Sequence, residues 1–151
     1  MDNLRNHDFS LTMEMRPTFK EYRLKIFEWT LRCVPKYLEL TYNTLEHSFR
    51  LFDIYVSSAK RTYCNLYSAF HDYLACLFIS QKFIELYPRK LELFVRASQN
   101  NFSRQALKER ELEILVVVDF KLVISLPSEW YAHLYGLKEM PKWAYECIAH
   151  L

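Results

Sequence analysis

Glycine is nearly absent from this sequence, which has one glycine among its 151 residues. Folds with many strands depend on glycine for tight turns, and phosphate-binding loops depend on it for close approach of the backbone. The sequence therefore excludes a P-loop and a dinucleotide-binding fingerprint, and it favours an all-α protein. The length is that of about one domain with one hydrophobic core.

Closely spaced cysteines and blocks of like charge are also missing. The four cysteines, at positions 33, 64, 76 and 147, lie too far apart to provide the paired ligands of a structural zinc site. The 20 Lys and Arg residues are interleaved with 18 Asp and Glu residues, and the resulting net charge of +2 does not indicate nucleic-acid binding. Charged residues or His interrupt every long apolar run, so neither a membrane span nor a secretory signal is predicted. We expect an intracellular protein, nuclear or cytoplasmic, without a cofactor.

Apolar residues are abundant, at 51% of the sequence, and they recur at helical spacing. Their periodicity predicts five helices, at residues 21–34, 41–56, 63–86, 88–97 and 103–118. The third helix is apolar on nearly all sides, as expected of a central helix that its neighbours bury. Residues 1–20 are polar and aperiodic and predict an N-terminal arm. The predicted five-helix domain spans 21–126, and Pro127 and Pro141 open the short segments of a C-terminal helical extension, 127–151.

Two charged residues interrupt the apolar faces of predicted helices. Lys82 shares its face of the third helix with Phe78, Ile79 and Leu86, and Glu111 shares its face of the fifth with Leu107, Ile114, Leu115 and Val118. Opposite charges on the inner faces of two helices suggest a pair. The pair is either a salt bridge within the chain, or it flanks an apolar surface and meets the backbone of a partner.

Four segments, in family order, resemble the motifs of the cyclin box, the five-helix domain with which cyclins bind and activate cyclin-dependent kinases. They are YRLKIFEW, with Arg23, Ile26, Glu28 and Trp29; LFDIYVS, with Asp53; LACLFISQKFIELYP, with Lys82, Phe83, Glu85, Tyr87 and Pro88; and FSRQALKERELEILVVVDFKL, with Glu111, Leu115, Phe120 and Leu122. The resemblance implies a five-helix cyclin box. Because only enough residues for one or two helices follow Pro127, it also implies a single-box cyclin, a shortened form or a fragment.

The resemblance implies a binding site for the kinase. Lys82 and Glu111 match family residues that flank the groove for the kinase's mobile helix and bond to it. Apolar family positions that pack against the same helix are matched by Phe83, Leu115, Phe120 and Leu122. The chain would be a regulatory subunit with no small-molecule substrate, and all catalysis would belong to the cyclin-dependent kinase.

Two further sets of residues match family positions with other roles. Arg23 and Asp53 match an internal ion pair that ties the first helix to the second. Tyr22, Ile26 and Trp29 match the groove with which many cyclins recruit substrates. In this sequence Tyr22 and Lys25 replace apolar residues of that groove, and Phe70 aligns with its Gln. These departures argue against substrate recruitment there.

Two other functions stay open at this point. The cyclin fold also serves adaptors, and an inactive cyclin mimic would bind a kinase without activating it. Alternatively, His47, the adjacent His71 and Asp72, and Asp119 reproduce the order of metal ligands in HD-type phosphohydrolases, in which a divalent ion activates water. That chemistry requires all four side chains on one cavity wall. The sequence does not name the kinase, nor does it distinguish a role in the cell cycle and cell division from one in transcription.

Overall fold

The computed structural model describes residues 19–135, with the backbone alone at positions 131, 132 and 135. Its elements are α2 (Phe19–Cys33), the π-helical turn η1 (Val34–Leu38), α3 (Tyr42–Ala59), α4 (Leu66–Ile84), α5 (Leu91–Ala97), α6 (Arg104–Val117) and α7 (Pro127–Tyr135). These residues contain no strand, so the all-α prediction is confirmed. Residues 1–18 of the predicted arm lie outside the described residues. The segment that begins at Pro141 lies wholly outside them. None of the described helices combines the length and apolar content needed to cross a membrane.

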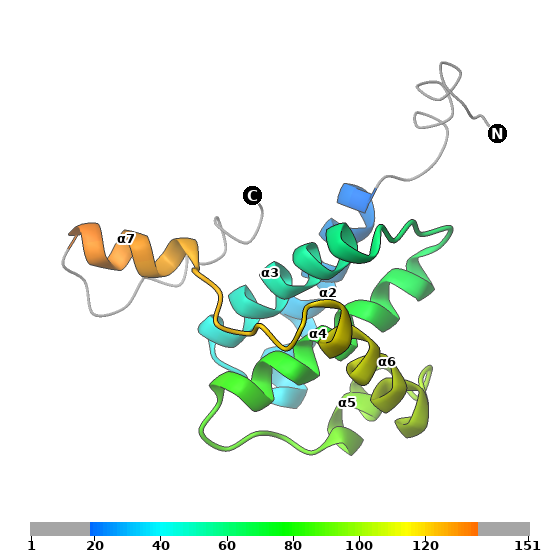
Figure 1. The fold of residues 1–151 in the computed structure, drawn as a ribbon. Coiled ribbons are helices and arrows are strands. Elements are labelled where there is room, and N and C mark those ends of the chain that lie inside the picture. Colours follow the sequence, from blue (N-terminus) through cyan, green and yellow to red (C-terminus); the bar gives the residue numbers. More distant parts are fainter. Residues whose placement is uncertain (1–18, 136–151) are drawn as a thin grey trace.

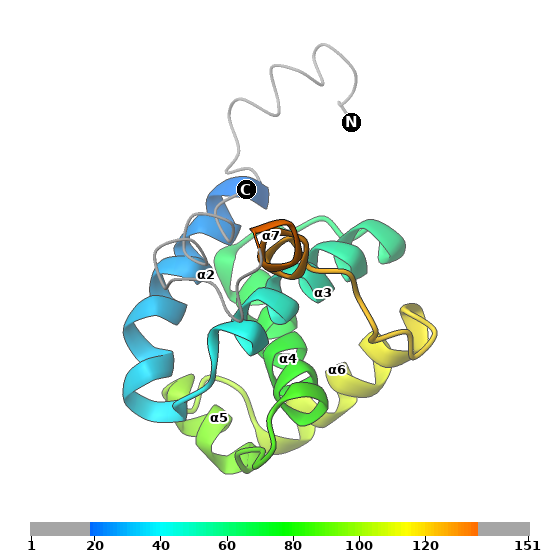
Figure 2. The same cartoon turned by 90° about the vertical axis from the view of Figure 1, so that its left-hand side faces the viewer.

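Helix α4 forms the centre of the bundle. Every residue from 72 to 81 is buried, and α2, α3, α5 and α6 all pack against this helix (Figure 1, Figure 2). Its neighbours cover it on all sides, which explains why its sequence is apolar nearly all round. The predicted five-helix arrangement around a buried central helix is confirmed.

Side-chain caps set the starts of three helices. The side-chain oxygens of Thr41, Asn65 and Ser103 accept hydrogen bonds from backbone N–H groups three residues later, at the starts of α3, α4 and α6. The cap predicted at Ser103 is confirmed. The predicted start of the third helix at residue 63 is wrong, because the Asn65 cap begins α4 at Leu66.

The chain between α4 and α5 is extended rather than helical. The buried side chain of Gln81 bonds both backbone groups of Arg89: its Oε1 accepts from the Arg89 N–H at 2.6 Å, and its Nε2 donates to the Arg89 carbonyl at 3.2 Å. These bonds hold Arg89 outside a helix, so the predicted start at Pro88 is wrong and α5 begins at Leu91. Leu86 lies beyond the end of α4 and is 82% exposed, so it does not continue the buried face.

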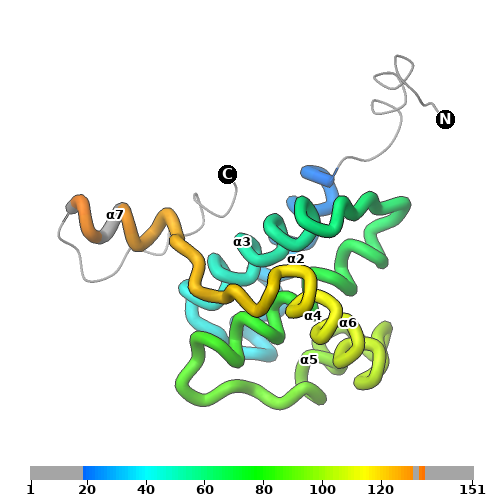
Figure 3. The backbone as a smooth tube through the Cα atoms, in the orientation of Figure 1, coloured from blue at the N-terminus to red at the C-terminus, as the bar shows by residue number. Residues whose placement is uncertain are grey.

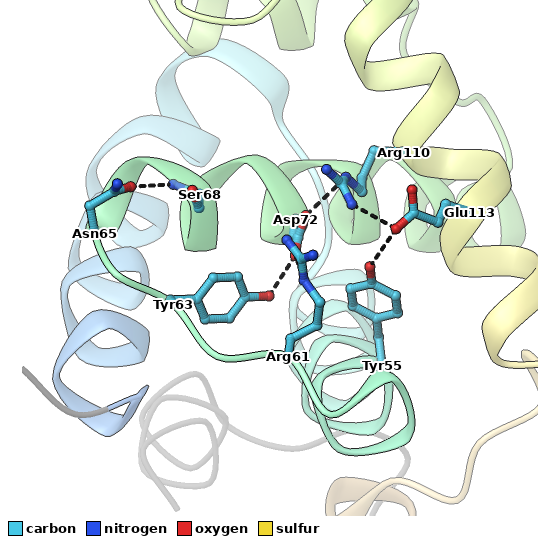
Figure 4. Close-up of polar contacts among 8 residues, drawn as sticks. All are labelled: Tyr55, Arg61, Tyr63, Asn65, Ser68, Asp72, Arg110 and Glu113. Atoms are coloured by element: carbon cyan, nitrogen blue, oxygen red, sulfur yellow. Dashed lines mark hydrogen bonds and ion pairs between the residues drawn. The ribbon is translucent and has the colours of Figure 1, made fainter. Parts of the chain in front are cut away.

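A buried carboxylate joins α4 to α6 and to the link between α3 and α4 (Figure 4). The side chain of Asp72 is 1% exposed and accepts hydrogen bonds from Arg61 Nε at 3.0 Å and from the Tyr63 hydroxyl at 2.6 Å. Arg110 Nε of α6 lies 3.0 Å from the other carboxylate oxygen. Two guanidinium groups and a phenol thus compensate one buried charge, which could not be buried without partners.

The same network reaches α3 through Glu113. Its carboxylate pairs with Arg110 at 2.8 Å and accepts a hydrogen bond from the Tyr55 hydroxyl at 3.2 Å. Burial and the bond to Asp72 raise the pKa of Tyr63, and burial raises the pKa of Tyr55. Both phenols therefore stay protonated and act as donors in the network.

A bidentate ion pair ties α2 to α3. Arg23 Nε donates to Asp53 Oδ1 at 2.9 Å, and Arg23 Nη2 donates to Asp53 Oδ2 at 3.1 Å. The guanidinium carbon also lies 5.0 Å from the ring centroid of Phe49. Two parallel bonds fix the geometry of the contact more closely than one point charge would.

Removal of this guanidinium tests its structural role. In Arg23→Ala the half-buried Asp53 carboxylate loses both bonds, and we expect the free energy of unfolding to fall by about 1–3 kcal/mol, the range for an orphaned buried partner. Urea denaturation measures the change. Arg50→Ala, which removes an exposed guanidinium from α3, is the matched control and should change stability by no more than about 0.5 kcal/mol. Equal effects of the two substitutions would contradict the structural role.

The pH dependence of stability follows from two covered histidines. Burial lowers the pKa of His47 and of His71 below the ordinary value of 6.5, and Arg110 lowers that of His71 further. At these two groups the unfolded chain binds protons more readily than the folded one, so the stability that the histidines contribute should be lost as the pH drops below about 6.5. Urea midpoints between about pH 7 and pH 5 measure the slope. A flat profile in the wild type would contradict the prediction.

Candidate partner-binding surface

An ion pair between Lys82 and Glu111 joins the last turn of α4 to α6. The Lys82 side chain is 45% exposed and that of Glu111 is 13% exposed. The ammonium also lies 4.5 Å from the ring centroid of Phe78, beside the core. The pair therefore sits at the rim of the core, with its cation open to solvent and its carboxylate largely covered.

This pair keeps bonding capacity for a partner. An ammonium has three N–H donors, and a carboxylate has about four acceptor positions. The bond between Lys82 and Glu111 uses one of each. A salt bridge within the chain and a contact to a partner's backbone are thus compatible, although the sequence had presented them as alternatives.

Four apolar residues predicted for the same surface lie on α4, on α6 and just after α6. Phe83 follows Lys82 and is 48% exposed, and Phe120 is 61% exposed. Leu115, one turn after Glu111 on α6, and Leu122 are partly buried against the core. The backbone N–H of Phe120 donates to the Leu115 carbonyl at 2.8 Å. This bond turns the chain after α6 back toward the last turn of the helix.

The chain from Asp119 to Leu126, here called the connecting segment, carries two of these apolar residues. Figure 3 shows it running from the end of α6 past α3 and α4 to α7, which extends away from the bundle. It begins with two left-handed residues, Asp119 at φ 58° and Phe120 at φ 56°. Such conformations cost about 1–3 kcal/mol each in non-glycine residues and persist only where surrounding contacts impose them.

Two adjacent buried polar residues of α3 anchor the connecting segment and the start of α7. His47 lies between Ser80 of α4 and the carbonyl of Leu122, with its ring nitrogens 2.7 Å from each oxygen. The Glu46 carboxylate accepts hydrogen bonds from the backbone N–H and the hydroxyl of Ser128. Burial raises the pKa of Glu46 and the bonds from Ser128 oppose this rise. One signal in the sequence could have indicated these anchors: two ionisable residues stand between the apolar Leu45 and Phe49.

The four residues of the proposed metal site are not brought together. His47 bonds Ser80 and Leu122, and Asp72 is enclosed by Arg61, Tyr63 and Arg110. The Asp119 side chain is exposed at the end of α6. Within residues 19–135, no group of three or more His, Cys, Asp or Glu side chains is arranged to hold a metal ion. The convergence that an HD-type phosphohydrolase requires is therefore missing from the described part of the chain.

A cavity of about 560 Å³ lies between α2 and the first turns of α4, and it includes two of the three residues matched to the substrate groove. Its lining consists of Lys25, Ile26, Glu28, Trp29, Arg32, Leu66, Tyr67, Phe70 and Asn101. The rings of Trp29 and Phe70 meet edge to face, with centroids 4.7 Å apart. Tyr22 belongs to the hydrophobic core and does not line the cavity.

Comparison with known proteins places these features in a family. No curated protein matches the sequence significantly. The family model of the cyclin N-terminal domain matches residues 2–123. The matched range contains helices α2 to α6, the Arg23–Asp53 and Lys82–Glu111 ion pairs, and all six residues of the candidate partner surface. The chain belongs to the cyclin family, by virtue of its cyclin N-terminal domain.

Proposed function

We propose that this chain is a regulatory subunit that binds and activates a cyclin-dependent kinase. The observation that carries the proposal is the ion pair of Lys82 and Glu111, together with two exposed rings: Phe83 follows Lys82 in α4, and Phe120 follows the end of α6. An exposed apolar surface with a charge pair at its edge suits an amphipathic helix, whose apolar side chains fill the surface while its polar backbone ends meet the charges. The site of action would be the nucleus or the cytoplasm, where such kinases work.

The mechanism would be conformational, with all catalysis left to the kinase. Docking would hold the kinase's mobile helix inward, so that the glutamate on that helix pairs with the phosphate-binding lysine. The docked helix would cover Phe83, Leu115, Phe120 and Leu122, and the interface would bury on the order of 2,000 Å² or more, as many signalling assemblies do. The chain itself would supply no catalytic residue.

Single substitutions in the ion pair test the binding role. We expect Lys82→Ala or Glu111→Ala to weaken kinase binding by about 2–5 kcal/mol, the effect of truncating one member of a charge pair that becomes buried on binding. Isothermal titration calorimetry against a panel of monomeric cyclin-dependent kinases gives the affinity, and a kinase assay gives the activation. Lys108→Ala removes an exposed lysine from the same helix as Glu111 and is the matched control.

The stability of the same variants separates two roles of the pair. Because Lys82 is nearly half exposed, its removal should change the free energy of unfolding by no more than about 1 kcal/mol. If either alanine variant unfolds, the pair is chiefly a structural salt bridge. If both variants fold and bind a kinase as the wild type does, the proposed docking site is wrong.

The apolar part of the surface has its own test. Phe83→Ala should lower kinase affinity by about tenfold or more, because it removes an aromatic side chain from the centre of the proposed interface. It should affect folding little, because the ring already stands half in solvent. Tyr67→Ala removes a similarly exposed ring at the opposite end of α4 and should leave affinity unchanged. Equal losses in the two variants would contradict a localised docking surface.

An adaptor or inactive cyclin mimic is the second candidate. The cavity between α2 and α4 favours it, because this hollow offers a peptide site apart from the proposed kinase surface. The kinase assay distinguishes the candidates: an activator raises the activity of a bound kinase, and a mimic binds without raising it. An adaptor would bind none of the kinases in the panel.

A further inference from the structure

The connecting segment carries part of the proposed kinase surface, and few hydrogen bonds hold this segment against the helices. It carries Phe120 and Leu122. At its start, the N–H of Phe120 bonds the Leu115 carbonyl of α6, and the N–H of Lys121 bonds the carbonyl of Val118, just after α6. For residues 122–124, the side-chain hydrogen bond within the described part of the chain is that of the Leu122 carbonyl with His47. Leu122 and Ile124 also pack against the core, and His47 is the polar anchor of this stretch.

His47 is built into the core at this point. Its side chain is 2% exposed, and its ring stacks at a tilt against Phe83, with centroids 5.5 Å apart. One imidazole thus touches both a side chain of α4 and the backbone of the connecting segment. Phe83 and Leu122, which lie on either side of it, both belong to the surface proposed for the kinase.

The two hydrogen bonds of His47 determine its tautomer. A carbonyl only accepts, so Nε2 must carry the hydrogen and donate to Leu122; Nδ1 can then accept from the Ser80 hydroxyl. Burial lowers the pKa of His47, which keeps this neutral form present at neutral pH. Ser80 in turn holds the ring in the orientation that points Nε2 at the segment.

We infer that His47 is a positioning residue of the kinase-binding surface: by joining the Leu122 carbonyl to Ser80, it fixes the connecting segment in its binding conformation before a partner arrives. The inference rests on the proposed function. The Glu46 bonds to Ser128 hold the far end of the segment, and the turn at Asp119 and Phe120 fixes its start, so His47 anchors the middle. A segment that is already ordered in the free protein loses little conformational entropy on binding. The affinity for the partner is therefore higher.

Two isosteric substitutions separate the two nitrogens of the ring. A Gln side chain reaches about as far as Nε2, so His47→Gln can still donate to the Leu122 carbonyl. An Asn side chain is one carbon shorter and reaches about as far as Nδ1, so His47→Asn can still bond Ser80 but not Leu122. Both residues are neutral amides, so the comparison holds polarity nearly constant.

The first readout needs no kinase. Amide hydrogen exchange of Phe120 and Lys121 reports opening of the connecting segment in the free protein. We expect His47→Asn to speed this exchange and to weaken kinase affinity by about tenfold, on the order expected for one lost hydrogen bond. His47→Gln should keep both values close to those of the wild type. If His47 only filled space, the longer amide would not restore both values in this way.

The outcomes distinguish this inference from the proposed function. If His47→Asn leaves both exchange and affinity unchanged, or if Gln and Asn perturb them equally, the positioning role is wrong even where the wild type binds a kinase. If no kinase binds the wild type, the proposed function fails instead, whatever the exchange data show. Should His47→Asn not fold, Ser80→Ala provides the test, because it keeps the imidazole and removes the hydroxyl that orients it. Unchanged exchange and affinity in Ser80→Ala would overturn the inference.

Discussion

The burial of α4 is the constraint on which the rest of the structure depends. A helix covered on all sides can carry charge only where a neighbour supplies the opposite charge. Asp72 is the first residue of the buried stretch and Lys82 directly follows it, and adjacent residues of α6, Arg110 and Glu111, pair with them. Because the two pairs have opposite polarity, a reversed placement of α6 would bring like charges together. The position of α6 against α4 is thus fixed by charge as well as by packing.

The proposed partner surface lies partly on two helices and partly on the connecting segment. Lys82, Phe83 and Glu111 lie on two helices that the core holds firmly, and binding sites on helices are positioned more precisely than those on loops. Phe120 and Leu122 lie on the connecting segment, outside any helix. Its order depends on a strained turn at one end and on buried polar residues of α3 along its length. A surface of this kind can lose affinity through residues that a partner never touches.

The sequence predicted the helices well because helix signals are local: apolar spacing, caps and prolines lie within a few residues of each other. It also placed Lys82 and Glu111 on inner faces, since a charge that interrupts an apolar stripe is visible in one segment. It did not predict the start of α5, because the decisive partner of Arg89 is the side chain of Gln81 on another helix. The role of His47 was not predicted for the same reason, and its place in a metal site stayed an open alternative: its partners, Ser80 and Leu122, lie far away in sequence.

The cavity and the proposed kinase surface lie at opposite ends of α4. The cavity beside Trp29 includes Leu66 and Tyr67 at the start of the helix, whereas the ion pair involves Lys82 in its last turn. A helix of 19 residues is about 28 Å long, so a helix docked at Lys82 would leave the cavity open. The buried helix also gives the two regions one rigid support. A ligand in the cavity could therefore be held at a fixed position relative to a partner bound at the other end, without any change in shape of the bundle.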